Sequence, residues 1–241
     1  MMLANIFTKD IRDHWRGIAI GVGSLVLMLL FAMAMYRNMD LGIYSNMPEA
    51  LRAVAGIPVN ADAGSLGISV LFSAYGAWVL VGLTIAAGSA FIAGEESNGT
   101  IGLLLANPKS RINMLVSKAA SMVLLMGLAV VFIWGSTYLV AGILGVEITG
   151  MAVGALALHL FANALFYGFL AMAIGAWTGN RGTAVGITIG LMFISIFAVG
   201  LLPLIEGWEN VVKVFPWYYF NGSEPLLHGI NWGHIGVLFA G

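Results

Sequence analysis

The sequence contains no cysteine and very few charged residues. Of its 241 residues, 9% are charged and 60% are hydrophobic. The missing cysteines exclude disulfides, thiolate nucleophiles and cysteine metal sites. A soluble domain carries roughly 25% charged residues, so this chain has too little polar surface for a soluble enzyme and suits a bilayer instead. Lys and Arg number 10 against 11 for Asp and Glu, so there is no basic field for nucleic acid, and no nucleic-acid partner is expected.

Long apolar runs predict an all-α membrane protein. A transmembrane helix needs about 20 mostly apolar residues, and five stretches reach that length while a sixth begins before the sequence ends. The apolar character is continuous rather than alternating, which excludes a β-barrel. We therefore predict a polytopic membrane helix bundle with a transmembrane domain over 17–241 and six spans, the last one incomplete in this sequence. The predicted spans are 17–36, 65–93, 114–144, 152–177, 184–204 and, in part, 232–241.

The segment 1–16 differs from the spans because charged residues alternate with apolar ones at helical spacing. This pattern predicts an amphipathic helix lying on the cytoplasmic membrane surface. Basic residues favour the cytoplasmic side, and an N-terminus inside places seven of the ten Lys and Arg there. The seven are Lys9, Arg12, Arg16, Lys109, Arg111, Lys118 and Arg181. We expect a multi-pass protein of the cell (plasma) membrane with a cytoplasmic N-terminus, a cytoplasmic loop at 94–113, and external segments at 37–64 and 205–231.

The predicted membrane interior lacks the groups that drive transport or catalysis. No Asp or Glu falls within a complete predicted span, and Lys118 lies at the inner end of the third span, from which its side chain is expected to reach the interface. Ion-driven carriers generally need ionisable groups at depth, where His159 is the one clear case. A lone His is more often a hydrogen-bonded packing residue than a proton relay. Neither His-Glu-x-x-His nor a Walker A loop occurs, so the chain is expected to be non-catalytic and to hold no metal or cofactor directly. Any uphill transport would need energy from another chain.

Two features leave alternatives open. Gly182, Gly186 and Gly190 form a ridge of small residues at four-residue spacing, which allows close approach of helices. The ridge serves either packing within this chain or a face shared with a second membrane subunit. The aromatic run Trp217-Tyr218-Tyr219-Phe220 is either an interfacial belt or a re-entrant element at the exit of a path.

The predicted cytoplasmic loop 94–113 has the pattern of a turn followed by a short helix. Gly99 permits a tight turn, Thr100 can cap the helix that follows, and Pro108 ends it. Charged residues flank its apolar ridge on both sides, which suits docking into a cleft on a soluble partner. The alternative is a plain connection between two spans.

This loop resembles the motif of the membrane permeases of ATP-binding cassette (ABC) type-2 exporters, which is Glu-Glu-x-x-Gly-Thr, then Leu-Leu, then Pro-x-Ser-Arg after the second span. The matching residues are Glu95, Glu96, Gly99, Thr100, Leu104, Leu105, Pro108, Ser110 and Arg111. The resemblance implies that these residues form the coupling element that contacts a separate ATPase subunit, in which ATP and magnesium are bound. It also implies a second permease chain, identical or different. The sequence departs from the family in its incomplete last span and in Gly102, which weakens the short helix.

By the same resemblance, the second and fifth spans line a path at the interface of two permease chains. The implied substrate contacts are Phe72, Tyr75, Trp78, Met192 and Phe197. The implied function is export of a hydrophobic or amphipathic substrate, such as a drug, an antibiotic or a lipid-like molecule. Two other classes remain open: a membrane scaffold or assembly factor without transport, and a carrier driven by an ion gradient.

Overall fold

The computed structural model describes residues 2–36, 47–48, 51, 67–69, 71–94, 99, 111–146 and 148–240. These residues are overwhelmingly helical, and no strand occurs among them. Within these described ranges, five helices are long and apolar enough to cross a membrane. The prediction of an all-α, polytopic membrane helix bundle is therefore confirmed.

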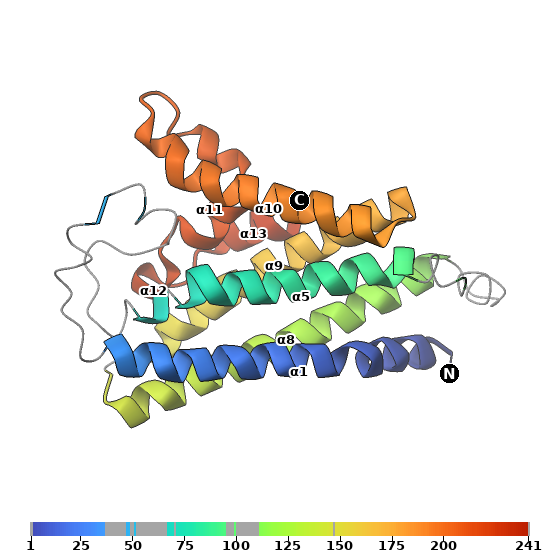
Figure 1. Cartoon of the computed structure of the whole chain (residues 1–241), viewed down its shortest axis with the longest axis horizontal. Coiled ribbons are helices and arrows are strands. Elements are labelled where there is room, and N and C mark those ends of the chain that lie inside the picture. The colour runs from blue at the N-terminus through green and yellow to red at the C-terminus, as the bar shows by residue number, and fades with distance from the viewer. Residues whose placement is uncertain are drawn as a thin grey trace.

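Five long helical segments build the bundle (Figure 1). Their bounds are α1 Met2–Tyr36, α5 Ala77–Ser89, α8 Arg111–Leu144, α9 Gly150–Thr178 and α10 Arg181–Leu201. Wider π-helical turns extend α5 at both ends, namely η1 Leu71–Gly76 before it and η2 Ala90–Gly94 after it. A tighter 3-10 turn, η3 Leu202–Leu204, follows α10. The remaining C-terminal part consists of short helices, which are η4 Val211–Val214, α11 Pro216–Asn221, α12 Pro225–His228 and α13 Trp232–Ala240.

Residues 2–16 are the first turns of α1 and are continuous with its apolar part. The sequence predicted an amphipathic helix along the membrane surface for 1–16, and in the structure the helix shows no break near residue 17. Asp10 is buried against α8, whereas Lys9, Arg12, Asp13 and Arg16 are exposed, and the position of this stretch on the membrane surface stays a prediction.

α9 is the central helix of the bundle. It packs against α5, α8 and α10, and the short helices α11, α12 and α13 also lie against it. α1 packs mainly along α8, and the two run side by side at one edge of the bundle (Figure 1). The N-terminus lies at the same end of the bundle as the end of α5 and the beginning of α8 (Figure 1).

α5 and α9 touch through their backbones where both helices carry glycine. A Cβ atom added to Gly88 would lie 2.1 Å from the carbonyl oxygen of Gly168. A Cβ atom on Gly168 would in turn lie 2.9 Å from Met122 Sδ. Only residues without side chains allow helices to approach this closely, so this glycine pair fixes the spacing of α5 and α9.

Local sequence signals define the tight connection between α9 and α10. Gly179 ends α9 in the left-handed conformation, with φ of 63° and its N–H bonded to the carbonyl of Gly175. Asn180 then caps α10, because its Oδ1 accepts a hydrogen bond of 3.0 Å from the backbone N–H of Thr183. Glycine after a helix and asparagine before the next are the expected residues for these positions.

Candidate functional site

The predicted coupling segment is carried by η2 and α8, since η2 ends at Gly94 and α8 begins at Arg111. Gly99 is exposed in a turn with φ of 68°, a backbone conformation that favours glycine. Most of the other motif residues, and the side chain of Arg111, lie outside the described residues. These other residues are Glu95, Glu96, Thr100, Leu104, Leu105, Pro108 and Ser110.

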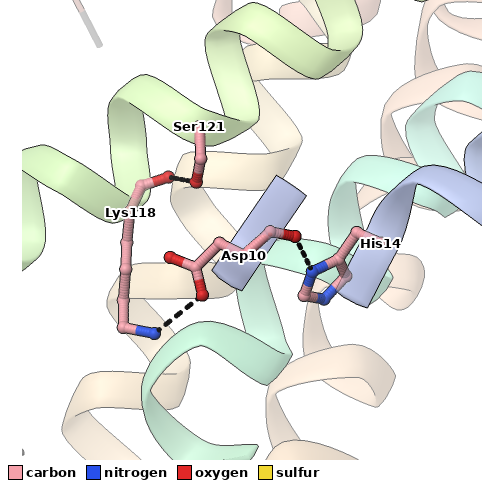
Figure 2. Close-up of polar contacts among 4 residues, drawn as sticks. All are labelled: Asp10, His14, Lys118 and Ser121. Carbon is pink, nitrogen blue, oxygen red and sulfur yellow. Dashed lines mark hydrogen bonds and ion pairs between the residues drawn. The ribbon is translucent and has the colours of Figure 1, made fainter. Parts of the chain in front are cut away.

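A buried ion pair joins α1 and α8 close to where this segment is attached. Lys118 Nζ lies 3.3 Å from Asp10 Oδ1, and both side chains are almost completely buried (Figure 2). One expectation from the sequence is therefore wrong, because Lys118 turns into the bundle rather than reaching towards the interface. Asp10 lies outside the predicted span 17–36 but within the membrane-length stretch Phe7–Met35 of α1. Both charged side chains can be buried because each is the partner of the other away from water.

Two aromatic rings complete this contact, which we call the root cluster: Asp10, His14, Phe91 and Lys118. Lys118 Nζ lies 5.4 Å from the centre of the Phe91 ring, within the range of a cation–π interaction. The His14 ring meets Phe91 edge-on at 5.2 Å, and its Nδ1 lies 2.9 Å from the Asp10 carbonyl oxygen, to which it donates when protonated (Figure 2).

The root cluster connects α1 to both elements that carry the coupling segment. Phe91 belongs to η2, which ends at Gly94, and Lys118 lies about two turns into α8. A displacement of the segment that moved η2 or α8 would therefore act directly on α1.

The predicted path residues divide into two groups. Tyr75, Trp78 and Phe197 are about half exposed on the surface of the single chain, whereas Phe72 and Met192 are buried in its core. Trp78 of the α5 segment meets Phe193 of α10 edge-on, with ring centres 5.9 Å apart.

Phe193 also stacks on Phe197 at 6.5 Å, so aromatic side chains cover one outer face formed by α5 and α10. Phe193 was not among the predicted path residues, although its four-residue spacing to Phe197 indicates a shared helix face.

The glycine ridge of α10 is open. A Cβ atom at Gly186 or Gly190 would meet nothing within 4 Å, and both residues are exposed. Within the described residues, neither glycine therefore serves close packing of α10 against another helix of this chain. Only 28% of the most apolar stretch of α10 is buried inside the protein, against 61% for the α5 segment. This leaves most of α10 for lipid or for another protein.

His159 is completely buried in α9, and its Nδ1 lies 2.9 Å from the carbonyl oxygen of Ala155. This bond agrees with its interpretation as a hydrogen-bonded residue, although its Nε2 has no partner in the structure. Across the described ranges, no three His, Asp or Glu side chains come close enough together to hold a metal ion.

Comparison with known proteins identifies the family. The model of the ABC-2 family transporter proteins matches residues 4–215, which include nearly all of α1, the helices from α5 to α10 and the whole predicted coupling segment. The chain belongs to the ABC-2 transporter family. It is also 30% identical over 150 residues to a probable ABC transporter permease protein, NosY, of Stutzerimonas stutzeri, with 58% of this chain and 54% of that protein covered. The chain thus spans about half the length of the curated relative that it matches. No solved structure gives a significant match.

Family membership agrees with the multi-pass helix bundle. Among the described residues five helices are of membrane length, and the sequence segment 95–111 lies between the second and third of them.

Proposed function

We propose that the chain is the membrane permease subunit of an ABC exporter and forms part of the path for a hydrophobic or amphipathic substrate. Energy comes from a separate ATPase subunit, which binds ATP and magnesium. The observation that carries this proposal is the family match over most of a chain whose coupling motif stands between two membrane helices. The relative's printed name, an ABC transporter permease protein, agrees with it.

The aromatic face of α5 and α10 supports a substrate path shared with a second permease chain. Trp78, Phe193 and Phe197 form a continuous exposed surface. The open glycines Gly186 and Gly190 continue it along α10. Small residues permit a second helix to approach, and aromatic rings offer apolar contact to a cargo. The path is lined on this side by side chains without charge, which favours hydrophobic or amphipathic cargo.

The root cluster supports transmission of motion from the coupling segment. When two ATPase subunits close on ATP, the segment 94–113 would act as a lever on η2 and α8. Asp10 and Phe91 then carry the displacement into α1 through Lys118. The helices of two permease chains would respond by exposing the path alternately to the two sides of the membrane.

The test is reconstitution with a candidate ABC ATPase subunit from the same source organism. The complex is purified in lipid nanodiscs, and ATP hydrolysis and subunit retention are measured for the unchanged chain and for Glu95→Ala/Glu96→Ala. We expect the double variant to lose the ATPase subunit or to lose cargo-stimulated hydrolysis. Glu206→Ala/Glu209→Ala is the matched control, because it removes two exposed carboxylates from the other predicted side of the membrane. Unchanged assembly and hydrolysis in the Glu95/Glu96 variant would overturn the coupling role, and hydrolysis that no cargo alters would favour a scaffold.

A further inference from the structure

Buried polar atoms without partners gather on one side of α9. Among the described residues, seven buried side-chain nitrogen or oxygen atoms have no hydrogen-bond partner, and six of them lie in α9 or in the C-terminal part 223–234. The six are His159 Nε2, Asn163 Nδ2, Asn163 Oδ1, Tyr167 Oη, Ser223 Oγ and His234 Nδ1. Native proteins leave few such atoms, so a concentration of six calls for a physical reason.

Three of these residues form a line along one helix face. His159, Asn163 and Tyr167 follow one another at four-residue spacing and are all fully buried. Ser195 of α10 lies beside the Tyr167 hydroxyl, and His234 together with the backbone of Asn231 lies near His159, in each case outside hydrogen-bond geometry. We call this set the polar seam: His159, Asn163, Tyr167, Ser195 and His234.

The seam leads towards a cavity near the end of the bundle where α9 begins. This cavity has a volume of about 440 Å³ and is lined by Ser223, His228, Gly229, Ile230, Asn231 and Trp232. Ser223 contributes one of the orphaned atoms, and Asn231 also lies near His159. Polar groups therefore continue from the cavity into the interior of α9.

The described conformation closes the seam to bulk solvent. The six atoms are sealed from solvent, and hydrocarbon offers them no hydrogen bonds either. Each would incur the full desolvation penalty if the seam stayed closed permanently. Apolar residues of similar size at these positions would avoid that penalty, so the groups are better explained by a second conformation in which they are satisfied.

We propose that the polar seam is the closed form of a water-binding file inside one protomer, which opens when α10 and the segment 211–240 move away from α9. Its side chains supply both donors and acceptors and hold no carboxylate, Lys or Arg. Water meets these requirements, since it donates and accepts and needs two to four polar partners. The two moving elements are tied to each other, because Ser195 Oγ accepts a hydrogen bond of 3.0 Å from the backbone N–H of Trp217. The file does not depend on the α5 and α10 face or on the transported cargo.

The chain contains no cysteine, so single cysteines report on the seam without background. Asn163→Cys is exposed to Ag⁺ in nanodiscs, and the thiols left free are counted with a maleimide after denaturation. Ala164→Cys is the control, because Ala164 is the next residue of the same helix and equally buried, but packs in the hydrophobic core. Ag⁺ travels with water and reacts with thiolate, so we expect the thiol of Asn163→Cys to be consumed many times faster than the thiol of Ala164→Cys. Equal rates at the two positions would overturn the proposal.

A second measurement uses the unsubstituted chain and so does not depend on the folding of a variant. X-ray footprinting generates hydroxyl radicals from water next to a side chain, and mass spectrometry locates the oxidised residues. We expect His159 and Tyr167 to be oxidised in excess of Met33 and Met126, which are equally buried among apolar residues although methionine is intrinsically more reactive. Oxidation of the methionines with sparing of His159 and Tyr167 would also overturn the proposal.

Discussion

Asp10 and Lys118 are separated by 108 positions in the sequence, yet Lys118 Nζ lies 3.3 Å from Asp10 Oδ1 in the interior of the bundle. The pair is placed where α1 and α8 meet, close to the attachment of the coupling segment. A buried pair of charges adds little net stability over apolar residues, but it penalises every arrangement in which one partner is missing. Its contribution is thus mainly to the register of α1 against α8.

The first prediction concerns the loss of one partner. Asp10→Ala removes the carboxylate that lies 3.3 Å from the buried Lys118 ammonium, so the free energy of unfolding should fall by about 3–5 kcal/mol. Asp10→Leu combined with Lys118→Leu removes both charges and should recover most of this loss. Unfolding in SDS, followed by circular dichroism, measures the difference.

Asp13→Ala serves as the control for Asp10→Ala, because Asp13 is an exposed carboxylate on the same helix. Its unfolding free energy should change by less than about 0.5 kcal/mol. If the double leucine variant is as unstable as Asp10→Ala, the pair is not the cause of the loss.

The second prediction concerns the contact between the α5 and α9 backbones. Gly88→Ala would bring a methyl group within 2.1 Å of the Gly168 carbonyl oxygen, so one helix has to move. The cost should reach at least about 2 kcal/mol, in the range of overpacked cores. Gly82→Ala, in the same helix and with open space around it, should be neutral or slightly stabilising. Thermal denaturation in detergent compares the two, and similar melting temperatures would contradict a close contact at Gly88.

The sequence was sufficient to predict the helices but not the contacts between them. Apolar runs predicted 114–144, 152–177 and 184–204, and α8, α9 and α10 coincide with them to within a few residues, because hydrophobic length is a local property. The Asp10–Lys118 pair and the Gly88–Gly168 contact depend on which helices are neighbours, which local patterns do not contain.

The candidate path shows the same limit at the level of a helix face. Phe72 and Met192 were chosen from the sequence together with Tyr75, Trp78 and Phe197, yet only the last three are exposed. Apolar residues surround the helices on all sides, so hydrophobicity does not distinguish a face that meets lipid from one that meets protein. Phe193 escaped notice for this reason.

The third prediction concerns the bond between α10 and α11. Ser195 Oγ accepts the backbone N–H of Trp217, which lies in the first turn of α11 and has no partner within that helix. Ser195→Ala leaves this buried N–H unsatisfied, so stability should fall by about 1–3 kcal/mol. Ser24→Ala is the control, because the exposed Ser24 hydroxyl bonds only to the Gly21 carbonyl of its own helix. Hydrogen exchange at 216–221 should accelerate in the first variant alone, and unchanged exchange would argue against the bond.

The last prediction tests whether the open glycine ridge of α10 meets a second copy of the chain. Gly190→Cys places a single thiol on the exposed ridge in a chain that has no other cysteine. If two α10 helices pack there, their backbones come close enough for a disulfide, whose Cα atoms are about 5.5 Å apart. Oxidation in native membranes should then give a covalent dimer on a non-reducing gel. Leu128→Cys lies near the middle of α8, exposed on that helix, and should stay monomeric because lipid covers it. A dimer with Leu128→Cys of equal yield, or none with Gly190→Cys, would remove the glycine ridge as an interface between identical copies.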